Sequence, residues 1–493
     1  MAQEPGFRDE LPIWAWSATD LVRAMEEGRL SSVDIVTAFL DRIGRHNRDG
    51  AGINAVRELD PTALFQAAAL DRERAEGRVR GPLHGVPVLL KDNIATSAPL
   101  HTTAGSVALD GMYGTREAPL VRRLRRAGVL ILGKTNLTEW ANFMTQHMPN
   151  GYSSLGGQVM NPFAPGRFDV GGSSSGSGAA VASGFAPLAI GTETSGSILS
   201  PASSNGIVGI KPTVGLVSRT AIIPISPSQD TAGPMTGTVA DAALLLAAIM
   251  GPDRHDAATW VRPPDRAYRD TLIEGIGTRN LAGVRIGVPR EGYWSRLGEA
   301  ALTVLNDALR DLVDLGGTVV DPVSLPHGGD LWDFTVLVYE FKPALNAYLA
   351  DLPAHAPVHS MLDVIHYNRS HAARALRYGQ VWFEQAQALS GSLTEARYLH
   401  TRQQDLRLSR TEGIDRALAD HGLQVLAFPG TYGAGIAAKA GYPSITVPAG
   451  YTEEDGPIGI TFTGPAYSEP TLVRVAAAFE ASADRRRRPP LDG

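Results

Sequence analysis

Short, wholly apolar segments alternate with helical segments along this chain, and this alternation limits the fold more than any other feature of the sequence. Residues 86–90 and 129–132 are apolar without alternating polar positions, and residues 119–127 between them have helical spacing. Such apolar runs are typical of strands that are buried on both faces. A sheet of this kind needs helices against its faces, so the sequence predicts an α/β fold.

Further segments extend this pattern toward both ends of the chain. A capping box at Ser31 and Asp34 begins a predicted helix, inside a helical N-terminal segment of about 12–75. Residues from about 330 to 410 are helix-rich and aromatic, and this excursion is a candidate cover for the sheet and the active site. Strands are also predicted at 284–288, 425–428, 444–447 and 459–462, and helices at 241–250 and 472–481.

Charge and composition exclude several classes of function. The 493 residues carry 45 basic and 51 acidic side chains, and this net charge of −6 argues against nucleic acid as a partner. The chain has no cysteine, which excludes disulfides, thiolate nucleophiles and cysteine metal sites. The longest apolar runs are about half of the ~20 residues that span a membrane, and no signal-peptide pattern opens the chain. We therefore expect a soluble, cytoplasmic protein with no membrane partner, and a solvated basic tail at 485–488.

Residues 171–178 read GGSSSGSG, which by composition alone fits a flexible linker, a phosphate loop or part of a catalytic site. The apolar residues 179–182 follow at once, and this disfavours a linker. A P-loop needs a lysine and a dinucleotide fingerprint needs a third glycine, and both are missing. Residues 172–176 match the G-x-S-x-G nucleophile elbow, but a turn-rich segment precedes them where the elbow needs a strand. The context favours a catalytic role of another kind.

The residues that follow can bring a second serine turn beside the first. A helix over 175–183 is about 14 Å long at 1.5 Å per residue, and Gly184 can end it. A returning strand over 186–190 is about 16 Å long at 3.3 Å per residue. Because these two lengths nearly cancel, we expect the turn 191–197, GTETSGS, next to the first serine cluster.

A serine hydroxyl needs a base before it can attack a carbonyl, and neither serine turn contains a histidine. His84 lies in a turn-rich segment, where we interpret it as structural. Lys91 directly follows the apolar run 86–90, which predicts that its amine is partly removed from water. A free lysine has a pKa of about 10.4, and burial can lower it to about 7 at a cost of ~4–5 kcal/mol. Taken alone, Lys91 also fits a solvated strand end, and only together with the two serine turns does it become the candidate base.

Together these residues resemble the amidase signature family. The resemblance rests on segments in the order 81–93 (GPLHGVPVLLKDN), 132–136 (LGKTN), 171–178, 191–197, 229–235 (QDTAGPM) and 440–448 (AGYPSITVP). Within the family it is strongest to bacterial peptide amidases, through 139–143 (EWANF), 191–194 (GTET), 212–218 and 339–342. Because the match covers most of the chain, it implies a single amidase signature domain over 1–493. The implied fold is a mixed, twisted central β-sheet covered by helices on both faces.

The resemblance also implies a mechanism, in which a Ser–cisSer–Lys triad hydrolyses a carboxamide through an acyl-enzyme. The lysine of the family corresponds to Lys91, its bridging serine after a cis peptide bond to Ser173, and its nucleophile to Ser197. Backbone N–H groups form the oxyanion hole of the family, and the corresponding residues are Thr194, Ser195, Gly196 and Ser197. The family chemistry requires no cofactor and no metal, so we expect neither.

Two departures from the family pattern leave the substrate open. Ser195 stands where members often have glycine and peptide amidases have aspartate, and Leu199 stands where arginine is common. A peptide amide or another small amide, an aryl amide, an ester and a carbamate (the substrate of a urethanase) all fit the chemistry. A further alternative is the amidase-like subunit of a transamidating complex that acts on charged tRNA. The sequence does not predict the oligomeric state.

Overall fold

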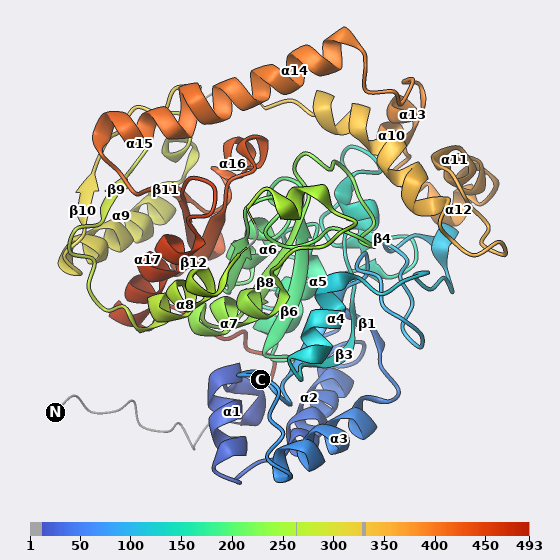
Figure 1. Ribbon diagram of the computed structural model, residues 1–493, viewed down its shortest axis with the longest axis horizontal. Helices are drawn as coiled ribbons and strands as arrows, with labels where there is room; N and C mark the ends of the chain where they lie inside the picture. The colour runs from blue at the N-terminus through green and yellow to red at the C-terminus, as the bar shows by residue number, and fades with distance from the viewer. Residues whose placement is uncertain (1–11, 263, 328–331, 493) are drawn as a thin grey trace.

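The computed structural model describes residues 12–262, 264–327 and 332–492, and its centre is a large β-sheet (Figure 1). Eleven strands form this sheet. Their spatial order is β1 (Val56–Leu59), β3 (Leu130–Thr135), β2 (Pro87–Lys91), β6 (Leu188–Glu193), β8 (Thr231–Thr236), β7 (Val208–Lys211), β12 (Ser444–Thr452), β13 (Gly456–Thr463), β11 (Val425–Pro429), β9 (Arg285–Gly287) and β10 (Thr318–Val320). A separate short hairpin joins β4 (Tyr152–Ser153) to β5 (Gly157–Gln158).

The directions of the strands confirm the predicted mixed sheet. The neighbours β3, β2 and β6 run parallel, and so do β11, β9 and β10. The pairs from β6 through β8, β7, β12 and β13 to β11 are antiparallel, and β1 pairs antiparallel with β3 at the edge. Lys91 is the last residue of β2, which lies between two parallel neighbours.

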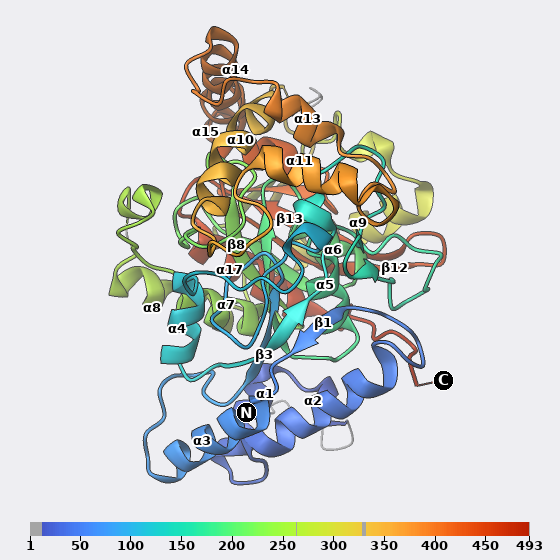
Figure 2. The same ribbon diagram turned by 90° about the vertical axis from the view of Figure 1, so that its right-hand side faces the viewer.

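Helices pack against both faces of the sheet, as Figure 2 shows from the side. On one face lie α5 (Ser175–Ala182) and α6 (Leu199–Ser204), and on the other lie α7 (Val239–Ile249) and α17 (Glu469–Ser482). Among the described helices, none has both the length and the apolar character needed to cross a membrane. Outside the N-terminal segment and the aromatic excursion, the chain also forms the α-helices α4 (Pro119–Arg126), α8 (Arg266–Glu274), α9 (Glu299–Asp314), α15 (Asp415–His421) and α16 (Ala434–Ala440).

Most predicted elements are confirmed, with shifted ends. The strands predicted at 284–288, 425–428, 444–447 and 459–462 correspond to β9, β11, β12 and β13. The returning strand predicted at 186–190 begins later and ends at Glu193. Two central strands, β7 and β8, were not predicted. They contain glycine, and β8 carries Pro234 opposite Ile190 in the middle of the sheet, a residue pattern that argues against a strand.

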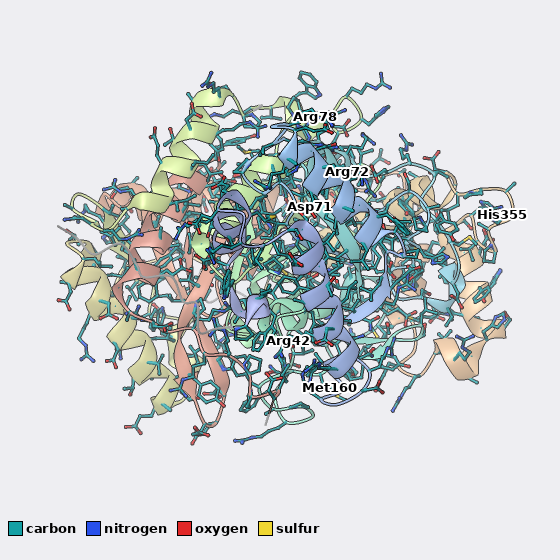
Figure 3. All side chains as sticks on the ribbon, turned by 90° about the horizontal axis from the view of Figure 1, so that it is seen from below. Arg42, Asp71, Arg72, Arg78, Met160 and His355 are labelled. Carbon is teal, nitrogen blue, oxygen red and sulfur yellow. The ribbon has the colours of Figure 1, made fainter. Side chains whose placement is uncertain are left out.

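The N-terminal segment forms α1 (Ala18–Glu26), α2 (Ser32–His46) and α3 (Ala63–Ala75), with β1 between the last two helices. The predicted capping box at Ser31 begins α2. Two helix starts are also capped by aspartates from other helices. Asp71 of α3 accepts the N–H groups of Ser32 and Val33, and Asp241 of α7 accepts those of Ala18 and Thr19. Figure 3 shows Asp71 among these N-terminal helices.

The aromatic excursion is helical, and it has a hydrophobic cluster of its own. It contains α10 (Thr335–Leu349), α11 (Met361–Ser370), α12 (Ala372–Ala375), α13 (Val381–Gln387) and α14 (Ala396–Leu406), along the top and the upper right of Figure 1. Its buried Phe341 and Phe383 pack with Trp140, Phe143 and Ile225 from the segments near the sheet. The first residues of the predicted excursion, 330 and 331, lie outside the described residues.

The prediction of a solvated basic tail at 485–488 is wrong. Arg485 forms an ion pair with Asp311 of α9 and stacks over Phe479, while Arg488 donates to the Ala15 carbonyl oxygen at 2.9 Å. Burial lowers the pKa of Arg486 to about 10. The end of the described chain therefore packs back onto the 3-10 turn Ile13–Ala15 and onto α2, close to the start of the fold (Figure 1). Arg485 and Arg488 thus each have a partner within the fold, which a solvated tail would not.

Asp71→Ala is expected to lower the free energy of unfolding by about 1–2 kcal/mol, because two N–H groups at the start of α2 lose their acceptor. Urea unfolding followed by circular dichroism measures this change. The matched control is Asp41→Ala, which removes only an exposed pair with Arg45 and is expected to cost less than about 0.5 kcal/mol. Equal effects of the two substitutions would contradict the capping role of Asp71.

Candidate active site

The side chain of Lys91, at the end of β2, is the centre of the candidate site. Its Nζ lies 2.8 Å from Ser173 Oγ, 2.9 Å from Thr192 Oγ1 and 3.2 Å from the Thr192 carbonyl oxygen. The side chain is 0% exposed, and within the described residues it forms no salt bridge. Strands β3 and β6 flank β2 on its two sides, so the position in the sheet removes this amine from water.

Hydrogen bonds join the first serine turn directly to β6. The peptide bond Gly172–Ser173 is cis, and Ser173 is buried just before α5. A side chain at Gly172 would overlap the side chains of Asn150 and Thr138, which would then have to shift. Ser174 Oγ donates to the Thr192 carbonyl oxygen at 3.0 Å and accepts the Thr192 N–H at 3.2 Å. These bonds hold the turn beside the amine of Lys91.

The second serine turn lies against the first, as the helix and strand lengths predicted. The N–H of Ser174 donates to the carbonyl oxygen of Ser197 at 3.1 Å. Ser197 is partly exposed whereas Ser173 is buried, so Ser197 is the more open of the two residues to solvent. Across the described part of the chain, no hydrogen bond joins the hydroxyl groups of Ser173 and Ser197. The structure thus brings together the side chains of Lys91 and Ser173, and it brings Ser197 close through the backbone.

Glu193 shapes the second turn, and sequence reasoning missed it. Its carboxylate accepts the N–H groups of Gly196 at 2.8 Å, Ile198 at 2.7 Å and Leu199 at 3.1 Å. The N–H of Gly196 is therefore already engaged. The other expected members of the oxyanion hole are Thr194, Ser195 and Ser197. Within the described residues, no acceptor engages their N–H groups. A buried acid at the end of a strand and just before a glycine turn is the signal that could have identified Glu193.

Burial sets the electrostatics of the site. It lowers the pKa of Lys91 to about 7, against a smaller opposing effect of Glu193 and Asp230. Burial also raises the pKa of Asp230 to about 6, although that carboxyl accepts the Thr194 hydroxyl at 2.5 Å. A lysine with this pKa is partly uncharged at neutral pH, as a proton acceptor must be. Across the described chain, no three His, Asp or Glu side chains are grouped so that they could hold a metal ion.

Comparison with known proteins decides the family. The model of the amidase family matches residues 34–473. The chain belongs to the amidase signature family. A probable amidase of Arabidopsis thaliana is 40% identical over 96% of this chain and 90% of its own length. The crystal structure of native peptide amidase from Stenotrophomonas maltophilia is 44% identical, with a TM-score of 0.92 over 98% of this chain and 100% of that one.

A further relative differs in its named role. It is one of the subunits of the glutamyl-tRNA(Gln) amidotransferase of Aromatoleum aromaticum, and it is 32% identical over 96% of this chain and 98% of its own length. The neighbouring structures confirm the amidase signature fold that the sequence predicted. The family and these neighbours make this amidase a hydrolase that acts on carbon–nitrogen bonds of linear amides.

Two more residues of the segment 81–93 have roles that the structure defines. His84 is structural, as interpreted, because its Nε2 is bonded to the Leu70 carbonyl oxygen at 3.0 Å and its Nδ1 receives the Arg80 N–H. Asn93 was quoted only as part of a motif. Its Nδ2 donates to Thr192 Oγ1 at 3.0 Å, so it supports the same hydroxyl that contacts Lys91.

Glu193→Gln is expected to lower the free energy of unfolding of the amidase by about 2–4 kcal/mol. One amide oxygen cannot replace two carboxylate oxygens for three buried N–H donors, and bonds to charged groups contribute about 1.5–3 kcal/mol each. Urea unfolding followed by fluorescence measures the change. Glu26→Gln is the matched control, because Glu26 of α1 is exposed. We expect this substitution to change the free energy of unfolding by less than about 0.5 kcal/mol. A Glu193→Gln variant as stable as that control would contradict this role.

Proposed function

We propose that the amidase cleaves a carboxamide with a Ser–cisSer–Lys triad of Lys91, Ser173 and Ser197. The observation that carries the proposal is the 2.8 Å hydrogen bond between Ser173 Oγ and the buried amine of Lys91. This amine has a pKa lowered to about 7 by burial, so its uncharged form is populated at neutral pH. An uncharged amine can take a proton from a serine, whereas an ammonium group cannot.

Thr192 orients the amine for this step. An uncharged lysine amine has two N–H donors and one lone pair. The carbonyl oxygen and the hydroxyl of Thr192 accept the two donors, at 3.2 and 2.9 Å. The lone pair is then left to face Ser173 Oγ, which donates its proton to Lys91 Nζ.

The reaction proceeds in two halves. Ser197 Oγ attacks the amide carbon while its proton passes to Ser173, whose own proton passes to Lys91. The tetrahedral intermediate collapses as Ser173 gives a proton to the leaving nitrogen and regains one from Lys91, so that ammonia departs and the amine of Lys91 is uncharged again. A water molecule then attacks the acyl-enzyme through the same relay, which releases the acid and restores Ser197. Attack requires the hydroxyls of Ser173 and Ser197 to move into hydrogen-bonding distance when substrate binds.

Three backbone donors stabilise the oxyanion in this mechanism. The N–H groups of Thr194, Ser195 and Ser197 are available, while that of Gly196 is engaged by Glu193. Loss of one such donor costs about 3–4 kcal/mol of transition-state stabilisation in comparable enzymes. The departure at Ser195 leaves its backbone donor in place and puts an exposed hydroxymethyl group beside the nucleophile.

The substrate class that fits best is a peptide amide, or a small amide like it. Support comes from the 44% identity to a peptide amidase over nearly the full length of both chains. The alternative of a transamidating subunit has support at 32% identity. These two alternatives are separated by the lone purified chain, because amide hydrolysis without a partner chain favours the peptide amidase. Cleavage of aryl amides, esters or carbamates is tested by comparing an anilide and an aryl carbamate with a peptide amide.

Ser197→Ala is expected to lower kcat for a peptide amide at least about 10³-fold, because the attacking oxygen is lost. The assay is ammonia release from N-acetyl-norleucinamide by the purified chain. Ser203→Ala on α6 is the control, because this partly buried serine lies outside the proposed triad and is expected to retain activity within a few-fold. Near-normal turnover by Ser197→Ala would contradict the proposal that Ser197 is the nucleophile.

The pH profile tests Lys91. Its cation cannot accept a proton, so kcat/KM is expected to fall about tenfold per pH unit below about pH 7 and to level off above it. Measurement between pH 5 and 9 shows this limb, with circular dichroism at each pH to check the fold. Asp230→Asn is the comparison variant, because the pKa of Asp230 is raised to about 6, and the acid limb is expected to persist in it. A profile that stays flat down to pH 5.5 would contradict Lys91 as the base.

A further inference from the structure

A cavity of about 360 Å³ opens beside the second serine turn. Residues 192–194 of β6 and the start of the turn form one side of it, and the segment 219–231 forms another. The third side is α10, the first helix of the aromatic excursion, which contributes Ala344, Ala347 and Tyr348. The excursion therefore supplies one wall of a space that reaches the turn carrying Ser197.

Each of the two arginines in the lining of this cavity is paired with a carboxylate of the lining. Arg219 Nη2 lies 2.6 Å from Asp256 Oδ1, and its Nε lies 2.7 Å from the other oxygen of that carboxylate. Arg116 forms an ion pair with Asp351 at the end of α10, with the two atoms 2.5 Å apart.

The remaining acids of the lining are engaged by hydrogen-bond donors. Asp230 accepts the Thr194 hydroxyl at 2.5 Å and the N–H groups of Ile225 and Ser226 at 2.9 Å each. Glu193 accepts the three N–H groups of the serine turn. In the described lining, each arginine and each carboxylate thus already has a partner inside the protein.

The rest of the lining is largely apolar. It includes Ile222, Ile223, Pro224 and Ile225 and the alanines of α10, whereas its polar members include Asn93, Thr115, Thr220 and His255. A charged group that entered this space would lose water and gain no counterion, which is unfavourable. An apolar group would be removed from water and would gain contacts, which is favourable.

The size of the cavity shows which part of an amide needs it. This step rests on the proposed function, in which a carboxamide loses ammonia. Ammonia fills almost no space, so the bulk of such a substrate lies on the acyl side of the bond. The departure from the family pattern at Leu199 does not change the shape of the cavity, because Leu199 is fully buried and does not line it.

We propose that this cavity binds the acyl side of the substrate and selects amides whose terminal residue has an uncharged, apolar side chain. Ala347 sets the room available to that side chain. It is exposed on the surface of α10 that lines the cavity, so a larger residue there narrows the cavity without disturbing the core. The inference makes the aromatic excursion a determinant of specificity.

Substrate pairs that differ by one charge test the selection. N-acetyl-norleucinamide and N-acetyl-lysinamide have the same chain up to the amine, and N-acetyl-norvalinamide and the α-amide of N-acetyl-glutamic acid differ by a carboxylate. With the wild-type chain, kcat/KM is expected to be at least about 30-fold higher for the uncharged member of each pair. Equal rates within either pair would overturn the proposed selection.

Ala347→Trp tests the position of the acyl group. It is expected to lower kcat/KM for N-acetyl-norleucinamide at least tenfold, mainly through KM, and to leave N-acetyl-glycinamide within about twofold. Ala350→Trp, one residue beyond α10 and outside the cavity lining, is the matched control and is expected to change neither value.

Acetanilide identifies the opposite arrangement, because its bulk lies on the leaving amine. A selective loss of acetanilide hydrolysis in Ala347→Trp would place the leaving group in the cavity and overturn the inference. The same holds for a loss of N-acetyl-glycinamide equal to that of N-acetyl-norleucinamide. Normal norleucinamide hydrolysis by Ala347→Trp would refute the acyl site and leave the triad standing. If the wild-type chain hydrolyses none of these amides, the proposed function fails and the inference falls with it.

Discussion

A buried amine without a counterion is the constraint on which the site depends. Lys91 lies at the end of a central strand, and its hydrogen-bonding partners are the neutral oxygens of Ser173 and Thr192. The nearby carboxylates of Glu193 and Asp230 are engaged by other donors, so neither forms a salt bridge with the amine. The charged form of Lys91 is therefore disfavoured, and the fold itself produces the proton acceptor that the proposed chemistry needs.

The sheet topology explains why this amine meets two serine turns. Strands β2 and β6 are parallel neighbours, so their carboxyl ends lie at the same edge of the sheet. Lys91 ends β2, and Glu193 ends β6 just before the turn that contains Ser197. Helix α5 begins after Ser173 and packs along the sheet, and β6 returns to the same edge, where the second turn meets the first. The excursion then closes one side of the adjacent cavity through α10.

The sequence predicted those parts of the site that rest on length and apolar pattern. The predicted helix 175–183 and the predicted strand 186–190 have nearly equal lengths, and this brought the two serine turns together in the prediction as in the structure. The burial of Lys91 follows from the apolar strand before it. Glu193 was missed because an acid between two threonines has the composition of an exposed turn. Its three N–H donors are defined only once the turn is folded. Strand β8 and the anchored tail were misjudged for the same reason, since Pro234 and Arg485 are stabilised by distant residues.

The pKa of Lys91 itself is the measurement that tests the proposed proton acceptor most directly. The chain has only five lysines, so ¹³C NMR of protein labelled at lysine Cε gives a spectrum with few signals. The signal that disappears in the Lys91→Met variant identifies the residue. The account predicts that this signal titrates near pH 7, because burial disfavours the cation. Titration near the ordinary lysine value of about 10.4 would contradict it, since the amine would then be charged at neutral pH and unable to take a proton from Ser173.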